Sequence, residues 1–174
     1  MKKILSFIII LMTFVTNASQ ALPFPDEWDI HLVVDEMTDE PEFVFIYTMG
    51  INHIESTLNI IYRFDNDMMY IQIIDYNSFH PTPENTEVHV RFNKNEAIEW
   101  SKVHSVQYTE NSIFLHGISE FLVLGITAEM LEDETDPVVL IRYSDTFSVK
   151  TVRFSLSGLN YAFNEFKNMI EIKK

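Results

Sequence analysis

The amino-acid sequence predicts a mainly β protein, an antiparallel sandwich of two sheets with one internal helix and one C-terminal helix. Two observations support this fold class. Many short segments alternate apolar and polar residues, as strands with one buried face do, and turn-forming residues separate them. Only residues 118–131 and 159–170 show apolar patterns that favour a helix. Numerous short strands with a helix at the end favour two packed sheets with helices at one edge.

Residues 1–21 predict a signal peptide. Two lysines precede an uncharged apolar run from Ile4 to Val15, and small residues stand at the expected cleavage positions, Ser19 and Ala21. A retained membrane-spanning helix is the alternative, but it needs about 20 apolar residues and the polar residues after Val15 end the run early. We therefore expect cleavage after Ala21 and export, with the periplasm as the compartment.

The exported part, residues 22–174, has a length typical of one domain. Loss of Lys2 and Lys3 leaves ten basic residues against 26 acidic ones, so the net charge becomes −16. Nucleic acid and anionic lipid surfaces would repel this chain, whereas basic partners and cations would be attracted to it. The chain has no cysteine, which excludes thiol catalysis and cysteine metal sites.

Five strands are expected in the first half of the exported chain. They cover residues 30–34, 43–48, 58–64, 69–73 and 88–92. The turn-forming run from Asp65 to Met68 predicts that the third and fourth strands form a hairpin. The fifth strand has the clearest alternation, with apolar side chains on one face and Glu87, His89 and Arg91 on the other. We expect that second face to be solvated.

After a turn at residues 93–95, Trp100 anchors the next segment and a short strand covers residues 113–115. Residues 118–131 predict a helix capped by Ser119. A buried strand broken at Gly125 is the alternative, but the length of the segment favours the helix.

Residues 137–163 organise the whole chain, because two strands run directly into a helix. In the second strand Val152, Phe154 and Leu156 are expected to face the core, and the alternate residues, including Ser155, to face solvent. Ser157 is expected to cap the helix. The apolar residues of the helix recur at three- and four-residue spacing: Leu159, Phe163, Phe166 and Ile170. The strand and the helix would therefore share one core.

The sequence contains no catalytic motif, neither a Gly-x-Ser-x-Gly elbow nor a Ser-x-x-Lys pair. We interpret Trp28 and Trp100 as core anchors. The acidic residues at 35–42 lack the Asp-x-Asp-x-Asp-Gly order of a calcium loop, so a solvated loop is our interpretation and Ca²⁺ binding is the alternative. The histidines lack zinc-ligand spacing: His31, His53, His80, His89, His104 and His116. We expect no catalytic residue, metal or cofactor; a hydrolase site built from distant carboxylates is the remaining enzymatic alternative.

A series of landmarks runs through nearly the whole exported chain. It starts at Trp28, passes Arg63 in a strand and Trp100, and ends in a closing motif from Phe154 to Ala162. The full series is Trp28, Asp39, Leu58, Arg63, Asn66, Tyr70, Val88, Arg91, Trp100, Phe121, Leu122, Phe154, Leu156, Ser157, Gly158, Leu159 and Ala162. In this order it resembles the periplasmic accessory proteins of type VI secretion of the VasI/TagO type.

The resemblance also points to two cysteines that this chain lacks. In the family one Cys follows the strand arginine and another ends the last helix, and the corresponding positions here are Phe64 and Ile170. If those cysteines are bonded in relatives, Phe64 and Ile170 approach closely, because a disulfide needs Cα atoms about 4.4 to 6.8 Å apart.

The resemblance implies a non-enzymatic, exported accessory or adaptor protein that acts through protein–protein contacts. Its partner would be another exported or envelope protein, such as a component of a secretion system, with no nucleic acid and no stable membrane anchor after cleavage. The loss of both cysteines, together with the acidic charge, leaves one alternative. The chain would then be a stand-alone periplasmic inhibitor or immunity protein that neutralises a toxin or a hydrolase.

Overall fold

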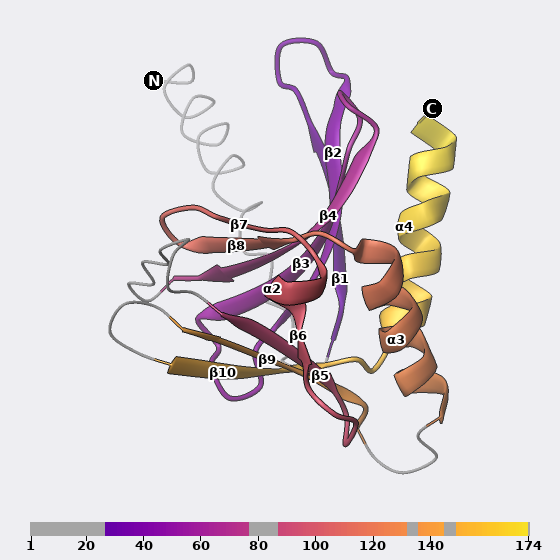
Figure 1. The fold of residues 1–174 in the computed structure, drawn as a ribbon. Helices are drawn as coiled ribbons and strands as arrows, with labels where there is room; N and C mark the ends of the chain where they lie inside the picture. The colour runs from indigo at the N-terminus through magenta and orange to yellow at the C-terminus, as the bar shows by residue number, and fades with distance from the viewer. Residues whose placement is uncertain (1–26, 77–86, 132–135, 145–148, 174) are drawn as a thin grey trace, which may run out of the picture.

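The computed structural model describes residues 27–76, 87–131, 136–144 and 149–173, so the expected signal peptide lies outside the described residues. Two antiparallel sheets pack face to face, and two longer helices lie beside them (Figure 1). Buried residues of both sheets and both helices form one hydrophobic cluster. This architecture confirms the mainly β, two-sheet fold predicted from the sequence.

The six-stranded sheet, sheet A, has the order β1-β2-β3-β4-β8-β7. Its strands are β1 (Asp29–Val34), β2 (Pro41–Met49), β3 (Ser56–Arg63), β4 (Met68–Asp75), β7 (Val106–Tyr108) and β8 (Ser112–Leu115). β3 and β4 form the expected hairpin, in which Arg63 pairs with Met68. The face toward the core is fully buried and includes Val44, Ile46, Leu58, Ile60, Ile71 and Ile73. β2, β3 and β4 therefore all contribute to the core, and β3 and β4 are the two middle strands of the sheet.

The four-stranded sheet, sheet B, has the order β10-β9-β5-β6. Its strands are β5 (Val88–Phe92), β6 (Ile98–Glu99), β9 (Val138–Ser144) and β10 (Val149–Ser155). The expected alternation in β5 holds, since its valines are buried while Arg91 is exposed and His89 is half-buried. The core face also contains Val139, Ile141, Tyr143, Val152 and Phe154. The outer faces of sheets A and B consequently lie on opposite sides of the sandwich.

Three helices complete the described fold: α2 (Trp100–Val103), α3 (Ile118–Leu131) and α4 (Leu159–Lys173). The expected internal and C-terminal helices are α3 and α4, and α4 buries Leu159, Phe166 and Ile170 as its spacing predicts. α4 packs against α3 and along β2. A Cβ on Gly125 would lie 3.3 Å from a Leu159 methyl carbon, so the glycine lets the two helices approach. Among the described residues, no helix has the length and apolar character needed to cross a bilayer.

The two sheets are joined at a corner where β2 ends. Gly50 forms a bridge with Phe154 of β10, and the backbone N–H of Ile51 donates to the carbonyl of Arg153 at 2.7 Å. A Cβ on Gly50 would lie only 2.5 Å from the carbonyl oxygen of His53 and 2.7 Å from Val152. Only glycine fits this close approach, so the position fixes how the chain after β2 contacts β10 of sheet B.

Two expected serine caps are wrong. Ser119 lies inside α3, which already begins at Ile118, and its hydroxyl contacts Glu120. At α4 the first amides are bound by another helix, because the carboxylate of Glu129 accepts from the N–H of Gly158 at 3.1 Å and of Asn160 at 2.9 Å. A carboxylate supplies charge as well as an acceptor, which suits the positive end of a helix.

The expected solvent exposure of Ser155 is also wrong, because this residue is buried at 2% exposure. Its hydroxyl accepts from the backbone N–H of Ser157, and its carbonyl accepts from the indole of Trp28 at 3.1 Å. Trp28 thus covers the end of β10, so both faces of the strand are shielded from solvent at Ser155.

The short elements α2, β6 and β7 were not expected.

Candidate functional site: the outer face of sheet A

The outer face of sheet A carries a row of aromatic side chains. Phe43, Phe45 and Tyr47 alternate on β2 with the buried residues Val44 and Ile46, so they point away from the core. Their neighbouring ring centroids lie 5.9 and 5.8 Å apart. The His31 ring of β1 stacks on Phe45 at 5.4 Å, and both rings remain half-buried. The row is therefore a continuous aromatic strip on the surface of the sheet.

This strip is part of an open groove of about 680 Å³. Apolar and aromatic side chains dominate its lining, and the polar groups come from His31, Thr57, Asn59, Gln72 and the tyrosine hydroxyls. The complete lining is His31, Val33, Phe43, Phe45, Tyr47, Met49, Ile54, Thr57, Asn59, Ile61, Gln72, Ile74 and Tyr76. A concave surface of this size with few polar groups is typical of a binding site. We call it the outer groove.

Asp29 supplies negative charge beside the outer groove. Its carboxylate lies 3.1 Å from Nε2 of His31. Partial burial, reinforced by the Asp29 carboxylate, raises the pKa of the Tyr47 hydroxyl. Tyr47 is therefore a neutral hydrogen-bond donor at physiological pH rather than a base.

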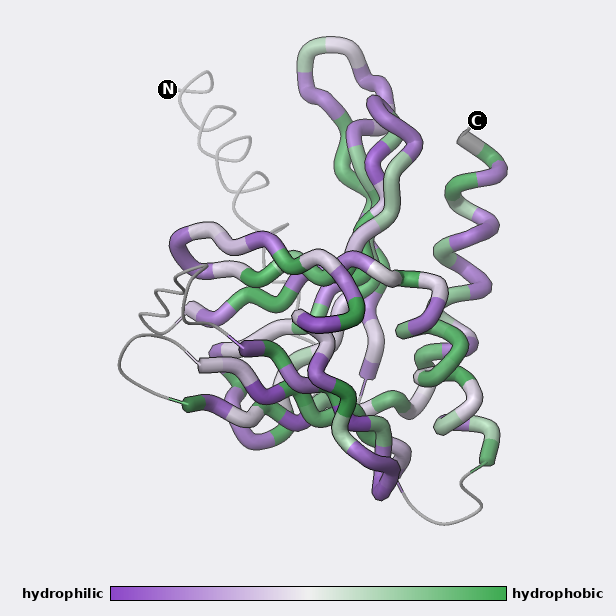
Figure 2. Tube along the Cα trace, in the orientation of Figure 1, coloured by the Kyte–Doolittle hydropathy of each residue, from purple (hydrophilic) through white to green (hydrophobic). Residues whose placement is uncertain are grey.

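Seven acidic residues gather at the end of sheet A where the β1–β2 and β3–β4 hairpins project (Figures 1 and 2). They are Asp35, Glu36, Asp39, Glu40, Glu42, Asp65 and Asp67, and all are exposed. The only Lys or Arg between residues 34 and 68 is Arg63, and it pairs with Asp65 at 2.7 Å. We call this end the acidic tip. Val33 and Phe43 of the outer groove directly adjoin the acidic tip. The apolar surface of the groove is therefore continuous with a negatively charged surface.

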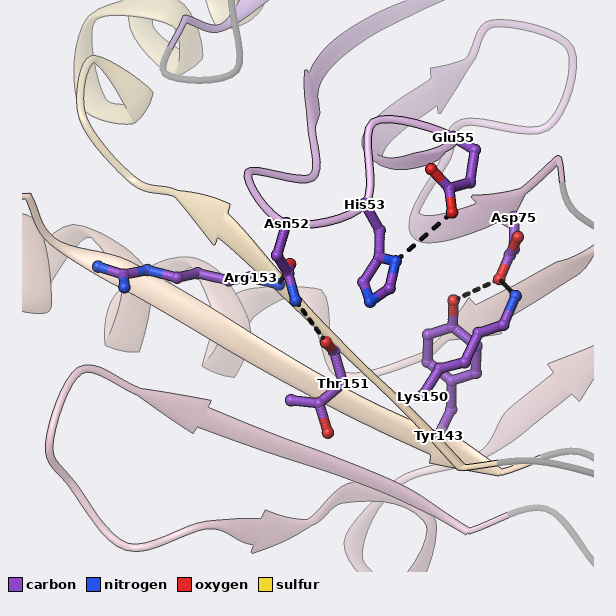
Figure 3. A network of polar contacts seen from close by, with 8 residues as sticks. All are labelled: Asn52, His53, Glu55, Asp75, Tyr143, Lys150, Thr151 and Arg153. Carbon is purple, nitrogen blue, oxygen red and sulfur yellow. Dashed lines mark hydrogen bonds and ion pairs between the residues drawn. The ribbon is translucent and has the colours of Figure 1, made fainter.

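A second polar cluster lies between the sheets and contains residue types used in catalysis (Figure 3). The carboxylate of Asp75, only 1% exposed, accepts from the hydroxyl of Tyr143 at 2.9 Å and from Nζ of Lys150 at 2.5 Å. Burial and the neighbouring carboxylate raise the pKa of Tyr143 well above its ordinary range. Tyr143 is fully buried and Lys150 is 23% exposed. Because the phenol and the carboxylate are enclosed, the geometry fits a structural contact that links β4 to β9 and β10.

Most apolar landmark residues build the core instead of the groove. Trp100 is 1% exposed and its indole donates to the carbonyl of His116 at 2.8 Å. The remaining core members of the series include Phe154, Leu156, Leu159 and Ala162. Gly158 precedes α4 with φ +80°, a conformation that favours glycine. The structure brings Trp28 to the closing motif through Ser155, whereas Arg63 lies on the outer face of sheet A.

The aromatic strip was missed by the sequence analysis, although a signal was present. In β2 the residues from Phe43 to Tyr47 are apolar or aromatic on both faces, which indicates a strand with two apolar faces.

The acidic loop at 35–42 forms a turn in which the Asp35 carboxylate accepts from the backbone N–H groups of Met37 and Thr38. Within the described ranges, no group of three or more His, Asp and Glu side chains is arranged to hold a metal ion.

Comparison with known proteins finds no matching protein-family model, no matching curated protein and no matching solved structure. The resemblance to the VasI/TagO type stays a prediction from the residues quoted for it.

Proposed function

We propose that this protein is an exported, non-enzymatic accessory or adaptor protein of the periplasm, and that it binds a protein partner through the outer groove. The observation that carries the proposal is the aromatic strip of Phe43, Phe45 and Tyr47 on a sheet face that points away from the core. Exposed aromatic clusters of this kind are typical of protein contacts, where large rings supply most of the binding energy.

The partner segment is expected to be apolar with basic residues at one end. Its apolar side chains would fill the groove, and its basic end would meet the acidic tip beside Phe43. The net charge of −16 after export favours a basic partner over an acidic one and disfavours a second copy of this chain. The order of landmarks that resembles the VasI/TagO type supports a secretion-system component as that partner.

The acidic tip also favours the alternative of an inhibitor or immunity protein. A negative surface next to an apolar groove suits a basic toxin or hydrolase, because charge complementarity speeds association. Both functions use the same groove and differ in what the partner does once bound.

A site-specific photocrosslinker tests the proposal. We expect a benzoylphenylalanine at Phe45 to crosslink an exported protein in the periplasm, whereas one at Tyr161, which is 75% exposed on α4, does not. With the purified partner, Phe45→Ser should weaken binding by about 2 kcal/mol, or roughly 30-fold, and Tyr161→Ser should leave it unchanged. The identity of the crosslinked partner distinguishes the two functions. A partner that loses enzymatic activity on binding indicates an inhibitor, whereas a component of a secretion system indicates an adaptor. Equal crosslinking from both sites, or crosslinking only to a second copy, would contradict the proposal.

A further inference from the structure

Three of the four arginines in the chain lie on the outer face of sheet B. Arg91 on β5 and Arg153 on β10 both pair with Leu140 of β9, one from each side. Arg142 lies two residues further along β9, so it shares the face of Leu140. Directly paired residues have Cβ atoms about 4.5 to 5.5 Å apart and diagonal ones about 7 to 8 Å. The three side chains therefore surround Leu140, and we call them the arginine cluster.

The three arginines of the cluster are exposed, and no carboxylate of the described residues forms an ion pair with them, although the chain has 26 acidic residues. Among the described residues, the ion pairs of lysine and of the remaining arginine are Arg63–Asp65, Lys102–Glu99 and Lys150–Asp75. Figure 3 shows the Arg153 side chain pointing away from Asp75 and Lys150. Three like charges this close repel one another, and a bound anion would relieve that repulsion.

Arg91 and Arg142 of the cluster line a hollow of about 230 Å³ that a small ligand would fill, and Arg153 lies next to it across Leu140. Ala97 and Leu140 give the hollow an apolar part, and the Thr151 side chain lines it beside Arg142. His89 lies on its other side and contacts Glu87 at 3.4 Å, while Glu99, paired with His89 across the strands, bonds Lys102 at 2.6 Å. The carboxylates of Glu87 and Glu99 are thus engaged with His89 and with Lys102, respectively.

We propose that the arginine cluster binds a small phosphate monoester with a compact apolar group. The planar guanidinium fork matches the oxygens of phosphate, and three positive charges suit a dianion. The apolar group would lie against Leu140 and Ala97. The inference goes beyond the proposed function, since it concerns the opposite sheet face and a different class of ligand.

The negative net charge of the chain favours a small anion over an extended one as the ligand of the arginine cluster. A polyanion or an anionic bilayer would extend beyond the cluster and meet the excess of carboxylates elsewhere. A small ligand stays within about 8 Å of the cluster, the distance over which physiological salt screens exposed charges. A soluble phosphate monoester is therefore favoured over a lipid headgroup with the same chemistry.

Titration calorimetry with phenyl phosphate and with inorganic phosphate tests the inference on the purified exported chain. We expect saturable binding, tighter for phenyl phosphate because its ring contacts Leu140. Arg142→Gln should weaken it about tenfold, and the triple variant Arg91→Gln, Arg142→Gln and Arg153→Gln should abolish it. The matched control is Arg63→Gln, which removes the same charge from an exposed strand position on sheet A and should bind like the wild type.

All four positions are on the surface, and circular dichroism checks that each variant folds. Absence of saturable binding by the wild-type chain, or equal binding by the triple variant, would overturn the inference. In a second arm, vesicles of phosphatidylcholine with phosphatidic acid should not sediment the protein at physiological salt. Sedimentation that depends on the arginine cluster, without binding of phenyl phosphate, would identify a membrane surface as the ligand and refute the soluble one.

Discussion

At the residue scale, Asp75 is the one charged side chain that is buried among the described residues. A buried carboxylate is costly unless it is paired and hydrogen-bonded. Asp75 meets both conditions through Tyr143 and Lys150, which come from the opposite sheet. The same contacts that satisfy the charge therefore hold sheet B against β4.

Tyr143 predicts a specific dependence of stability on alkaline pH. Burial raises the pKa of its hydroxyl, so the folded chain keeps this proton while the unfolded chain loses it near pH 10. The stabilising effect is complete below about pH 10 and is lost as pH rises, by up to about 1.4 kcal/mol per pH unit. We expect Tyr143→Phe to lower the free energy of unfolding by about 1 to 3 kcal/mol at pH 8, because Asp75 loses a buried donor.

Urea unfolding of both chains between about pH 8 and pH 11 checks this expectation. The difference between wild type and Tyr143→Phe should shrink above pH 10, because the variant cannot lose this proton. The other tyrosines with raised pKa, Tyr47, Tyr70 and Tyr108, remain in both chains and cancel in the comparison. A difference that stays constant over this range would contradict the assignment.

At the element scale, the start of α4 depends on α3. Glu129 binds the N–H groups of Gly158 and Asn160, so one helix caps the next. We expect Glu129→Ala to lower the free energy of unfolding by about 1 to 2 kcal/mol, because two helical donors lose their acceptor and the helix loses a favourable charge.

The matched control for this prediction is Ser157→Ala, one residue before Gly158. Its hydroxyl is exposed and does not bind these amides, so we expect a change within about 0.5 kcal/mol. Urea unfolding at neutral pH measures both variants. An equal loss for Ser157→Ala would restore the serine cap that the sequence suggested.

The cap at α4 is an example of a feature that local sequence patterns do not predict. The longer strands and α4 could be predicted because their periodicity is local, as Val88, Val90 and Phe92 illustrate. β6 and β7, with two and three residues, are too short to display a period. Glu129 is distant in sequence from the amides that it binds, so no local motif reports it.

The candidate site was harder to predict than the fold for a related reason. Alternation in β2 separates two faces but does not say which one is buried when both are apolar. The arginine cluster needs the register of three strands, which places Arg91 and Arg153 on either side of Leu140. That register forms only in the folded chain.

At the scale of the whole molecule, the sandwich presents two chemically opposite surfaces. The outer face of sheet A is aromatic and ends in the acidic tip, whereas the outer face of sheet B carries the arginine cluster. Repulsion among like charges in the acidic tip and in the arginine cluster opposes folding, and burial of the shared core offsets it. α4 contributes Leu159, Phe166 and Ile170 to this core and packs against β1 and β2 of sheet A.

An engineered disulfide between positions 64 and 170 tests that position and the family resemblance together. Phe64 packs edge-on against Tyr62 and donates its N–H to the carbonyl of Glu42 in β2. Ile170 is buried on α4, which packs along β2. We expect Phe64→Cys with Ile170→Cys to oxidise to a bond that raises the melting temperature, because it closes a loop of roughly 100 residues in the unfolded chain.

The control pairs Phe64→Cys with Ile172→Cys, since Ile172 is 80% exposed on another face of α4. Thiol titration and non-reducing electrophoresis should find the bond in the first pair and two free thiols in the second. Because a disulfide forms only when the Cα atoms approach to about 4.4 to 6.8 Å, two free thiols in the first pair would place these residues apart. That result would remove the correspondence with the two family cysteines while leaving the two-sheet architecture in place.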